Sequence, residues 1–175
     1  ALPICELDII YVGDFPQLKA RNVESAFMNG AIFLSNLIVD NDTLLKSIIH
    51  ELAHNVEVVY GADVYGDHKI IDEFISKRKR LRDILEHEEL FCDSRLYIQF
   101  DYSKTFDDFL YKTVGYDRMA LLTTNLYASP YAATSLREYF ANGFEHYFVD
   151  ENPKYLKVIS PKLFSKINDL TKMED

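Results

Sequence analysis

The order of its segments predicts that this chain folds as a single α+β domain. Strand-like segments come first and amphipathic helical patterns follow, as in folds that segregate a small sheet from its helices. The 175 residues suffice for one domain with its own core, and 48% of them are hydrophobic. Because the sequence contains no repeat, low-complexity tract or long linker, we expect residues 1–175 to form one unit.

The expected elements follow from periodicity and from end signals. Residues 5–12 and 31–39 are rich in β-forming side chains and predict two strands within a strand-rich part, residues 1–42. Several N-cap candidates precede a predicted helix over residues 43–60 that ends at Gly61. Further helical patterns cover residues about 70–90, 104–114, 117–126 and 134–149, and two short ones flank Pro161.

Composition argues against several classes of function. The formal net charge of −9 disfavours binding to nucleic acid, which needs a basic face. The one basic cluster, residues 77–82, is followed by glutamates and is interpreted as a solvated helix face. No stretch reaches the length of a membrane span. Cys5 and Cys92 lack metal-ligand spacing, and the sequence leaves open whether they form a disulfide.

The pattern with the clearest chemistry is H-E-x-x-H, formed by His50, Glu51 and His54 on the predicted helix over residues 43–60. At about 100° per residue, the two histidines lie one turn apart on one side of the helix. The opposite side carries an aliphatic stripe of Leu45, Ile48, Ile49, Leu52, Val56 and Val59. Two imidazoles at this spacing can bind one zinc ion, while Glu51 is placed to act as a general base on water. The alternative is a pair of surface histidines, and the opposed stripe favours the metal site.

A third protein ligand has to come from elsewhere, because catalytic zinc sites keep three protein ligands and one open position. The metzincin continuation is excluded, since Glu57 and Tyr60 stand where it needs Gly and His. The best candidate is Glu138 in the predicted helix over 134–149. It points away from a core stripe formed by Leu136, Tyr139, Phe140, Phe144 and Tyr147. Small side chains at Ala141 and Gly143 should let another helix approach closely.

Other interpretations of this helix stay open. Ser135 lies three residues before Glu138, so the glutamate could belong to a capping box. Ser129-Pro130 is an earlier candidate for the helix start. Glu145 lies on the same face two turns along and is the rival ligand, whereas His146 is interpreted as a structural histidine.

The residues HELAH at 50–54, Tyr131 and the run EYFANGF at 138–144 resemble the catalytic domain of anthrax toxin lethal factor and the related secreted Pro-Pro endopeptidases. The segments at 152–156 and 160–161 extend the resemblance. It implies a zincin-like fold: a small N-terminal sheet, an active-site helix and a mainly helical C-terminal part, with the third-ligand helix and C-terminal helices in 129–175. It also implies that Glu138 is the third zinc ligand and that Tyr131 supports the transition state.

The chain departs from this family in two ways. Asn142 stands where the family usually has a glutamate that contacts a ligand histidine, and an amide can take this part only without the charge. In addition, 84 residues separate His54 from Glu138, so residues about 61–104 could hold a helical insertion. The family's secreted members favour an extracellular location, which no residue here establishes.

These observations predict a zinc-dependent metalloendopeptidase acting on a peptide or protein. Zn²⁺ activates water and polarises the carbonyl, Glu51 acts as general base, and Tyr131 donates to the oxyanion. The strand at 31–39 is expected to be the edge on which substrate binds. One alternative is a zinc-binding structural or interaction module of a toxin or virion protein, and another is a self-processing protease domain. Substrate motif and oligomeric state are left open.

Overall fold

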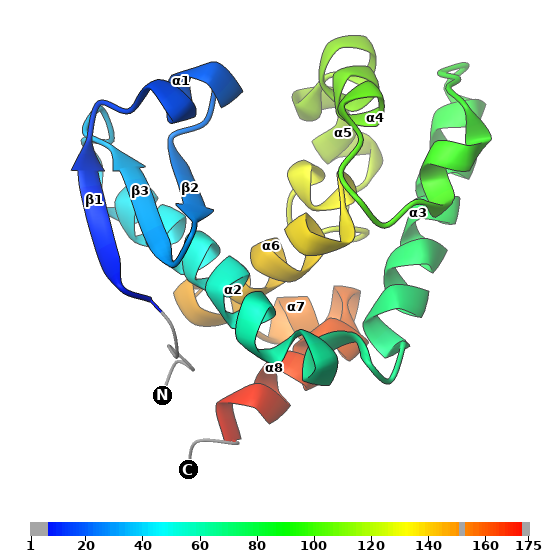
Figure 1. Ribbon diagram of the computed structural model, residues 1–175. Helices are drawn as coiled ribbons and strands as arrows, with labels where there is room; N and C mark the ends of the chain where they lie inside the picture. The colour runs from blue at the N-terminus through cyan, green and yellow to red at the C-terminus, as the bar shows by residue number, and fades with distance from the viewer. Residues whose placement is uncertain (1–6, 151–152, 173–175) are drawn as a thin grey trace.

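The computed structural model describes residues 7–150 and 153–172 and shows a mixed α+β fold with a three-stranded sheet and many helices (Figure 1). The sheet comes first along the chain and the helices follow, so the predicted order of segments is confirmed. Residues 5 and 6 of the first expected strand lie outside the described residues, and so does Cys5, whose pairing with Cys92 stays open.

The sheet consists of β1 (Ile9–Gly13), β2 (Ser25–Met28) and β3 (Ala31–Ser35), and helix α1 (Pro16–Arg21) connects the first two strands. The strand order is β1-β3-β2, with β1 parallel and β2 antiparallel to β3. The expectation that residues 31–39 form a substrate edge is therefore wrong. β3 ends at Ser35 and lies between two strands that occupy both of its edges.

The unpredicted strand β2 forms a hairpin with β3 through Asn29 and Gly30. Met28 pairs with Ala31, and the two residues between them both have positive φ, 51° and 77°. These values correspond to a type I′ turn, whose twist matches that of the flanking strands. Asn-Gly between two apolar runs is the sequence signal by which this hairpin could have been found.

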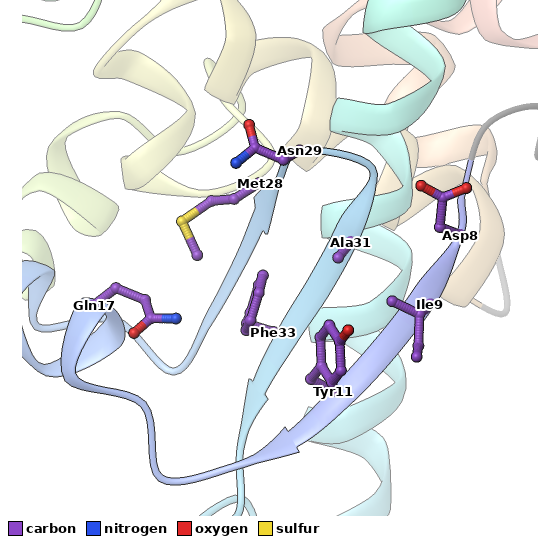
Figure 2. A pocket seen from close by; sticks show the side chains of 8 residues that line it. All are labelled: Asp8, Ile9, Tyr11, Gln17, Met28, Asn29, Ala31 and Phe33. Atoms are coloured by element: carbon purple, nitrogen blue, oxygen red, sulfur yellow. The ribbon is translucent and has the colours of Figure 1, made fainter.

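The two faces of the sheet have different surroundings. Ile32 and Leu34 are buried on the face that packs against the helix carrying the H-E-x-x-H motif. The opposite face is partly open, and Figure 2 shows Tyr11, Phe33 and Met28 lining a pocket of about 530 Å³ there. The candidate metal ligands do not line this pocket, so its size does not make it the site of the predicted chemistry.

Helix α2 (Asn41–Tyr65) carries the motif and begins at Asp40, whose carboxylate accepts a hydrogen bond from the N–H of Thr43 at 2.8 Å. The helix continues past the predicted end at Gly61, although Tyr60 has a non-helical φ of −108° and marks a kink. α2 lies between the sheet and α6 (Leu136–Val149) (Figure 1). Its middle is therefore buried on both sides.

This sandwiched position corrects the expected aliphatic stripe of α2. Leu45 and Val59 were expected in the core, yet their side chains are 49% and 36% exposed. Ala53, three residues after His50 and therefore on its side of the helix, is fully buried. A single-stripe interpretation assumes one packing partner, whereas α2 has the sheet on one side and α6 on the other.

Helix α3 (Lys69–His87) and the 3₁₀ turn η1 (Ser94–Ile98) occupy most of the segment considered as an insertion. The helix contributes fully buried side chains to the common core, namely Ile70, Phe74, Leu81 and Leu85. The interpretation of residues 77–82 as a solvated face is wrong for Lys77 and Arg78, whose side chains are 7% and 0% exposed. Backbone carbonyls from other segments accept their hydrogen bonds in place of water.

Apart from the turn η3, which no helical pattern covered, the remaining helices agree with the predicted patterns in order and approximate extent. They are α4 (Lys104–Asp108), the π-helical turn η2 (Phe109–Val114), α5 (Tyr116–Leu122), the 3₁₀ turn η3 (Pro130–Ala133), α6, α7 (Lys154–Ile159) and α8 (Pro161–Lys172). The close approach predicted at Gly143 is confirmed, because Leu163 of α8 occupies the space that a side chain would need there. Within the described ranges, no helix is long and apolar enough to cross a membrane.

Candidate metal centre

Three side chains from two helices meet between α2 and α6. Glu138 Oε2 lies 3.1 Å from His50 Nε2, and Glu138 Oε1 lies 3.6 Å from His54 Nε2. One ligand atom from each residue lies within 4.8 Å of the other two, so the group could hold a metal ion. The three residues predicted from the sequence as ligands are thus brought together by the fold.

The donor set suits zinc. Around a tetrahedral zinc ion with bonds of about 2.1 Å, neighbouring ligand atoms lie roughly 3.4 Å apart. The distances from the Glu138 carboxylate to the two Nε2 atoms, 3.1 Å from Oε2 and 3.6 Å from Oε1, are close to that value, and one ligand atom from each of the three residues lies within 4.8 Å of the others. Two imidazoles and one carboxylate also match the three-ligand composition of catalytic zinc sites, in which a fourth position stays open to water or substrate.

Carboxylates face the other ring nitrogens of both histidines. His50 Nδ1 lies 3.3 Å from Glu145 Oε2, and His54 Nδ1 lies 3.6 Å from Glu57 Oε2. Glu57 is itself held by Arg137 Nε at 2.7 Å and by the hydroxyl of Tyr65 at 2.6 Å. A carboxylate hydrogen-bonded to a ligand imidazole orients the ring and increases its basicity. Glu145 is within that distance of His50, whereas Glu57 is at ion-pair distance from His54.

This arrangement revises two expectations from the sequence. Glu145, the rival ligand, faces the outer nitrogen of His50, and it does not belong to the cluster of ligand atoms. Asn142 was expected to contact a ligand histidine, but its amide donates to the carbonyl of Glu138 at 2.9 Å and its side-chain oxygen accepts from Ser129. Glu145 of α6 and Glu57 of α2 thus make the contacts with the ligand histidines that were expected of Asn142.

The electrostatics of the centre favour a positive charge. Burial alone would lower the pKa of His50, but the neighbouring Glu138 and Glu145 raise it to about 10. Burial would raise the pKa of Glu138, but the two histidines lower it to about 2. The pKa of His54 is also raised, by Glu138 and Glu57 against the effect of burial. A site that stabilises cationic imidazoles in this way is also suited to a divalent cation.

Glu51 lies next to the ligands but is held by the sheet. Its side chain is only 5% exposed. Oε1 accepts a hydrogen bond from Ser25 Oγ at 2.7 Å, and Oε2 accepts one from the backbone N–H of Phe27 at 2.7 Å. Ser25 was not predicted as a functional residue, because the strand that carries it was not predicted.

Tyr131 lies in η3, immediately before the helix that carries Glu138. Burial raises the pKa of its hydroxyl, and the charges of Glu138 and Glu51 act in the same direction. The phenol therefore stays protonated and lies close enough to both carboxylates to be affected by them. Its ring makes an edge contact with Tyr116, 6.2 Å between centroids, and Tyr116 donates to Asp107 at 2.6 Å.

The local structure of α6 reconciles two interpretations of Glu138. Ser135 is the N-cap, and its hydroxyl accepts from the N–H of Glu138 at 3.1 Å, as a capping motif requires. The carboxylate of Glu138 nevertheless points to the histidines. Pro130 begins the separate turn η3, and His146 lies 2.8 Å from Asp150, as expected of a structural histidine.

Searches of protein-family models, of curated proteins and of solved structures returned no match to this chain. The functional conclusion therefore depends on the arrangement of the site itself.

Proposed function

We propose that this chain is a zinc-dependent metalloendopeptidase with a zincin-like active site, similar to the lethal factor and Pro-Pro endopeptidase family. The observation that carries the proposal is the convergence of His50, His54 and Glu138 beside a buried glutamate, Glu51. The same motif and third-ligand position carry the resemblance to that family. Retention of a metal alone does not require Glu51, so its secured position favours an enzyme over a purely structural zinc module.

The proposed mechanism assigns one task to each residue. His50, His54 and Glu138 would hold a zinc ion, which when bound would supply a Lewis acid for the scissile carbonyl and lower the pKa of water. Glu51 takes a proton from the attacking water and delivers it to the leaving amine. The hydroxyl of Tyr131 donates a hydrogen bond to the oxygen on which negative charge develops. Glu145 and Glu57 orient the two imidazoles from outside.

An extended peptide is the proposed substrate, and β2 is the strand on which it would lie. β2 is an edge strand of the described sheet, and two of its residues contact Glu51 directly. A peptide added along this edge would run past the candidate general base and would pair with β2 groups other than the N–H of Phe27, which Glu51 occupies. This proposal replaces β3 with β2 and keeps the idea of strand addition.

Metal analysis together with peptide cleavage tests the proposal. We expect about one zinc per chain in the wild type and cleavage of some members of a diverse peptide library, detected by mass spectrometry. Glu51→Gln should keep zinc and lose cleavage, because the glutamate is assigned to water. Glu138→Ala should lose zinc, whereas Glu145→Ala should weaken zinc binding by roughly ten- to a hundredfold.

A matched control is Glu86→Gln, which changes an exposed glutamate of α3 remote from the motif. It should alter neither zinc content nor cleavage. Wild-type protein without stoichiometric zinc after zinc addition would contradict the metal site. Full turnover by Glu51→Gln would contradict the mechanism.

A further inference from the structure

We propose that Ser25 is a positioning residue, which fixes the carboxylate of Glu51 so that the base meets its water in one orientation. The inference rests on the proposed function and adds to it a residue outside the H-E-x-x-H motif. Ser25 Oγ and the N–H of Phe27 each donate to a different oxygen of Glu51, both at 2.7 Å. The base on α2 is thus held by β2.

The register of the hairpin explains why β2 can reach Glu51 twice. Met28 and Ala31 flank the two-residue turn and form its closing pair, so Phe27, opposite Ile32, turns its N–H away from β3. Ser25 lies two residues earlier, so its side chain is on the same face as that of Phe27. One side-chain donor and one main-chain donor therefore converge on the same carboxylate.

Both bonds leave Glu51 able to act as a base. A carboxylate has about four acceptor positions, two on each oxygen. The two bonds from β2 occupy one position on each, so each oxygen keeps a lone pair for water. The length of 2.7 Å is typical of hydrogen bonds to a charged acceptor, which are stronger than neutral ones.

The catalytic consequence follows from the flexibility of glutamate. Its side chain has three rotatable bonds, and a base displaced by about 1 Å can cost roughly a hundredfold in rate. The Phe27 donor belongs to the main chain and remains in every substitution of Phe27 except proline. Ser25 is therefore the part of this anchor that a mutation can remove, and its loss leaves Glu51 held at one oxygen only.

The experiment compares Ser25→Ala with Ser25→Thr and with Ser35→Ala. Ser35 is a half-buried serine on the adjacent strand β3, and its hydroxyl accepts from the N–H of Leu37 at 3.2 Å. Zinc content, thermal unfolding, kcat and KM are measured on one peptide that the wild type cleaves. Ser25→Ala should lower kcat by roughly ten- to a hundredfold, with zinc content and KM unchanged. Ser25→Thr, which keeps a hydroxyl group, should retain most of the wild-type kcat. Ser35→Ala should keep the wild-type kcat.

A second readout does not depend on turnover. The amide of Phe27 faces away from β3, so its protection from hydrogen exchange should come from Glu51. NMR should find this amide protected in the wild type and in Ser35→Ala, less protected in Ser25→Ala, and unprotected in Glu51→Ala.

The possible failures are distinguishable. An unprotected Phe27 amide in the wild type, or a wild-type kcat in Ser25→Ala, would overturn the role of Ser25. Loss of zinc or an equal loss of kcat in Ser25→Ala and Ser35→Ala would show a merely structural effect and overturn it as well. Zinc-loaded wild-type protein that cleaves no peptide would overturn the proposed function. The difference in protection of the Phe27 amide between the wild type and Ser25→Ala would still decide whether Ser25 holds Glu51.

Discussion

The two sides of α2 hold the candidate catalytic groups by different means. On the sheet side, Glu51 is bound directly by Ser25 and by the backbone of Phe27, both from an edge strand. On the helical side, Tyr131 and Glu138 belong to a segment whose backbone is bound by a buried side chain of α3. The first anchor contacts the candidate catalytic group directly, whereas the second lies in the hydrophobic core.

The second anchor is the buried guanidinium of Arg78. It donates to the carbonyl of Ala133, two residues after Tyr131, and to the carbonyls of Leu96 and Gln99 at 2.8 and 3.2 Å. The ring of Phe106 lies 4.1 Å from the guanidinium carbon. Substitutions on the sheet side should therefore lower turnover more than stability, whereas substitution of Arg78 should mainly lower stability.

Tyr131→Phe should give the largest effect and tests the helical side at the catalytic group itself. A lost oxyanion donor typically lowers turnover by about a hundredfold to a thousandfold. Zinc content and thermal unfolding should stay unchanged, because the ring is retained and the hydroxyl is no ligand. The control is Tyr111→Phe, which removes an exposed hydroxyl. Wild-type turnover in Tyr131→Phe would leave this residue with a packing role only.

Arg78→Met should destabilise the protein by roughly 3 kcal/mol, since it leaves three carbonyls without a charged donor in the core. Chemical denaturation measures the change. Cleavage by the fraction that remains folded should fall much less than in Tyr131→Phe. Arg80→Met on the exposed face of the same helix is the control and should change stability little. Equal stabilities of the two variants would contradict the view of Arg78 as a core anchor.

Gly30→Ala tests the hairpin that presents β2, and we expect the smallest effect. A residue with a Cβ is strained at the positive φ of 77°, at a cost of about 1 kcal/mol in unfolding free energy. Zinc content should stay the same, because the candidate ligands lie on α2 and α6. Gly61→Ala is a control of opposite sign: open space surrounds the added methyl group, and the change should stabilise by about 0.5 kcal/mol. Thermal melts of both variants decide whether the turn behaves as a strained position.

The sequence predicted those features that repeat along one element. The spacing of His50 and His54 identified one helix face, and the apolar stripe of α6 left Glu138 on the opposite side of that helix. In the structure this opposite side is also buried, at Ala141 and Asn142. The fold brings these three groups within reach of one ion only because α2 and α6 pack together. The long helices were also predicted well, since several turns of periodicity define each of them.

Features that depend on a partner elsewhere in the chain were not predictable in this way. Lys77 and Arg78 have the same charge pattern as a solvated face, and only distant carbonyls make their burial tolerable. The contacts of Glu57 and Glu145 with the histidines likewise depend on how two helices meet. The strand β2 is short, with a single Asn-Gly signal, and missing it also misassigned the sheet edge.

The ligand cluster has a consequence for how the molecule folds. His50 and Glu138 are 88 residues apart in sequence, so their meeting requires the closure of a long loop. Neither helix alone provides the complete set of donors, and the cluster exists only when α2 and α6 are docked. An ion bound there would favour the docked state over the unfolded chain by mass action. Opening of α6 would disassemble the cluster, so the lifetime of a bound ion would be limited by how rarely these two helices separate.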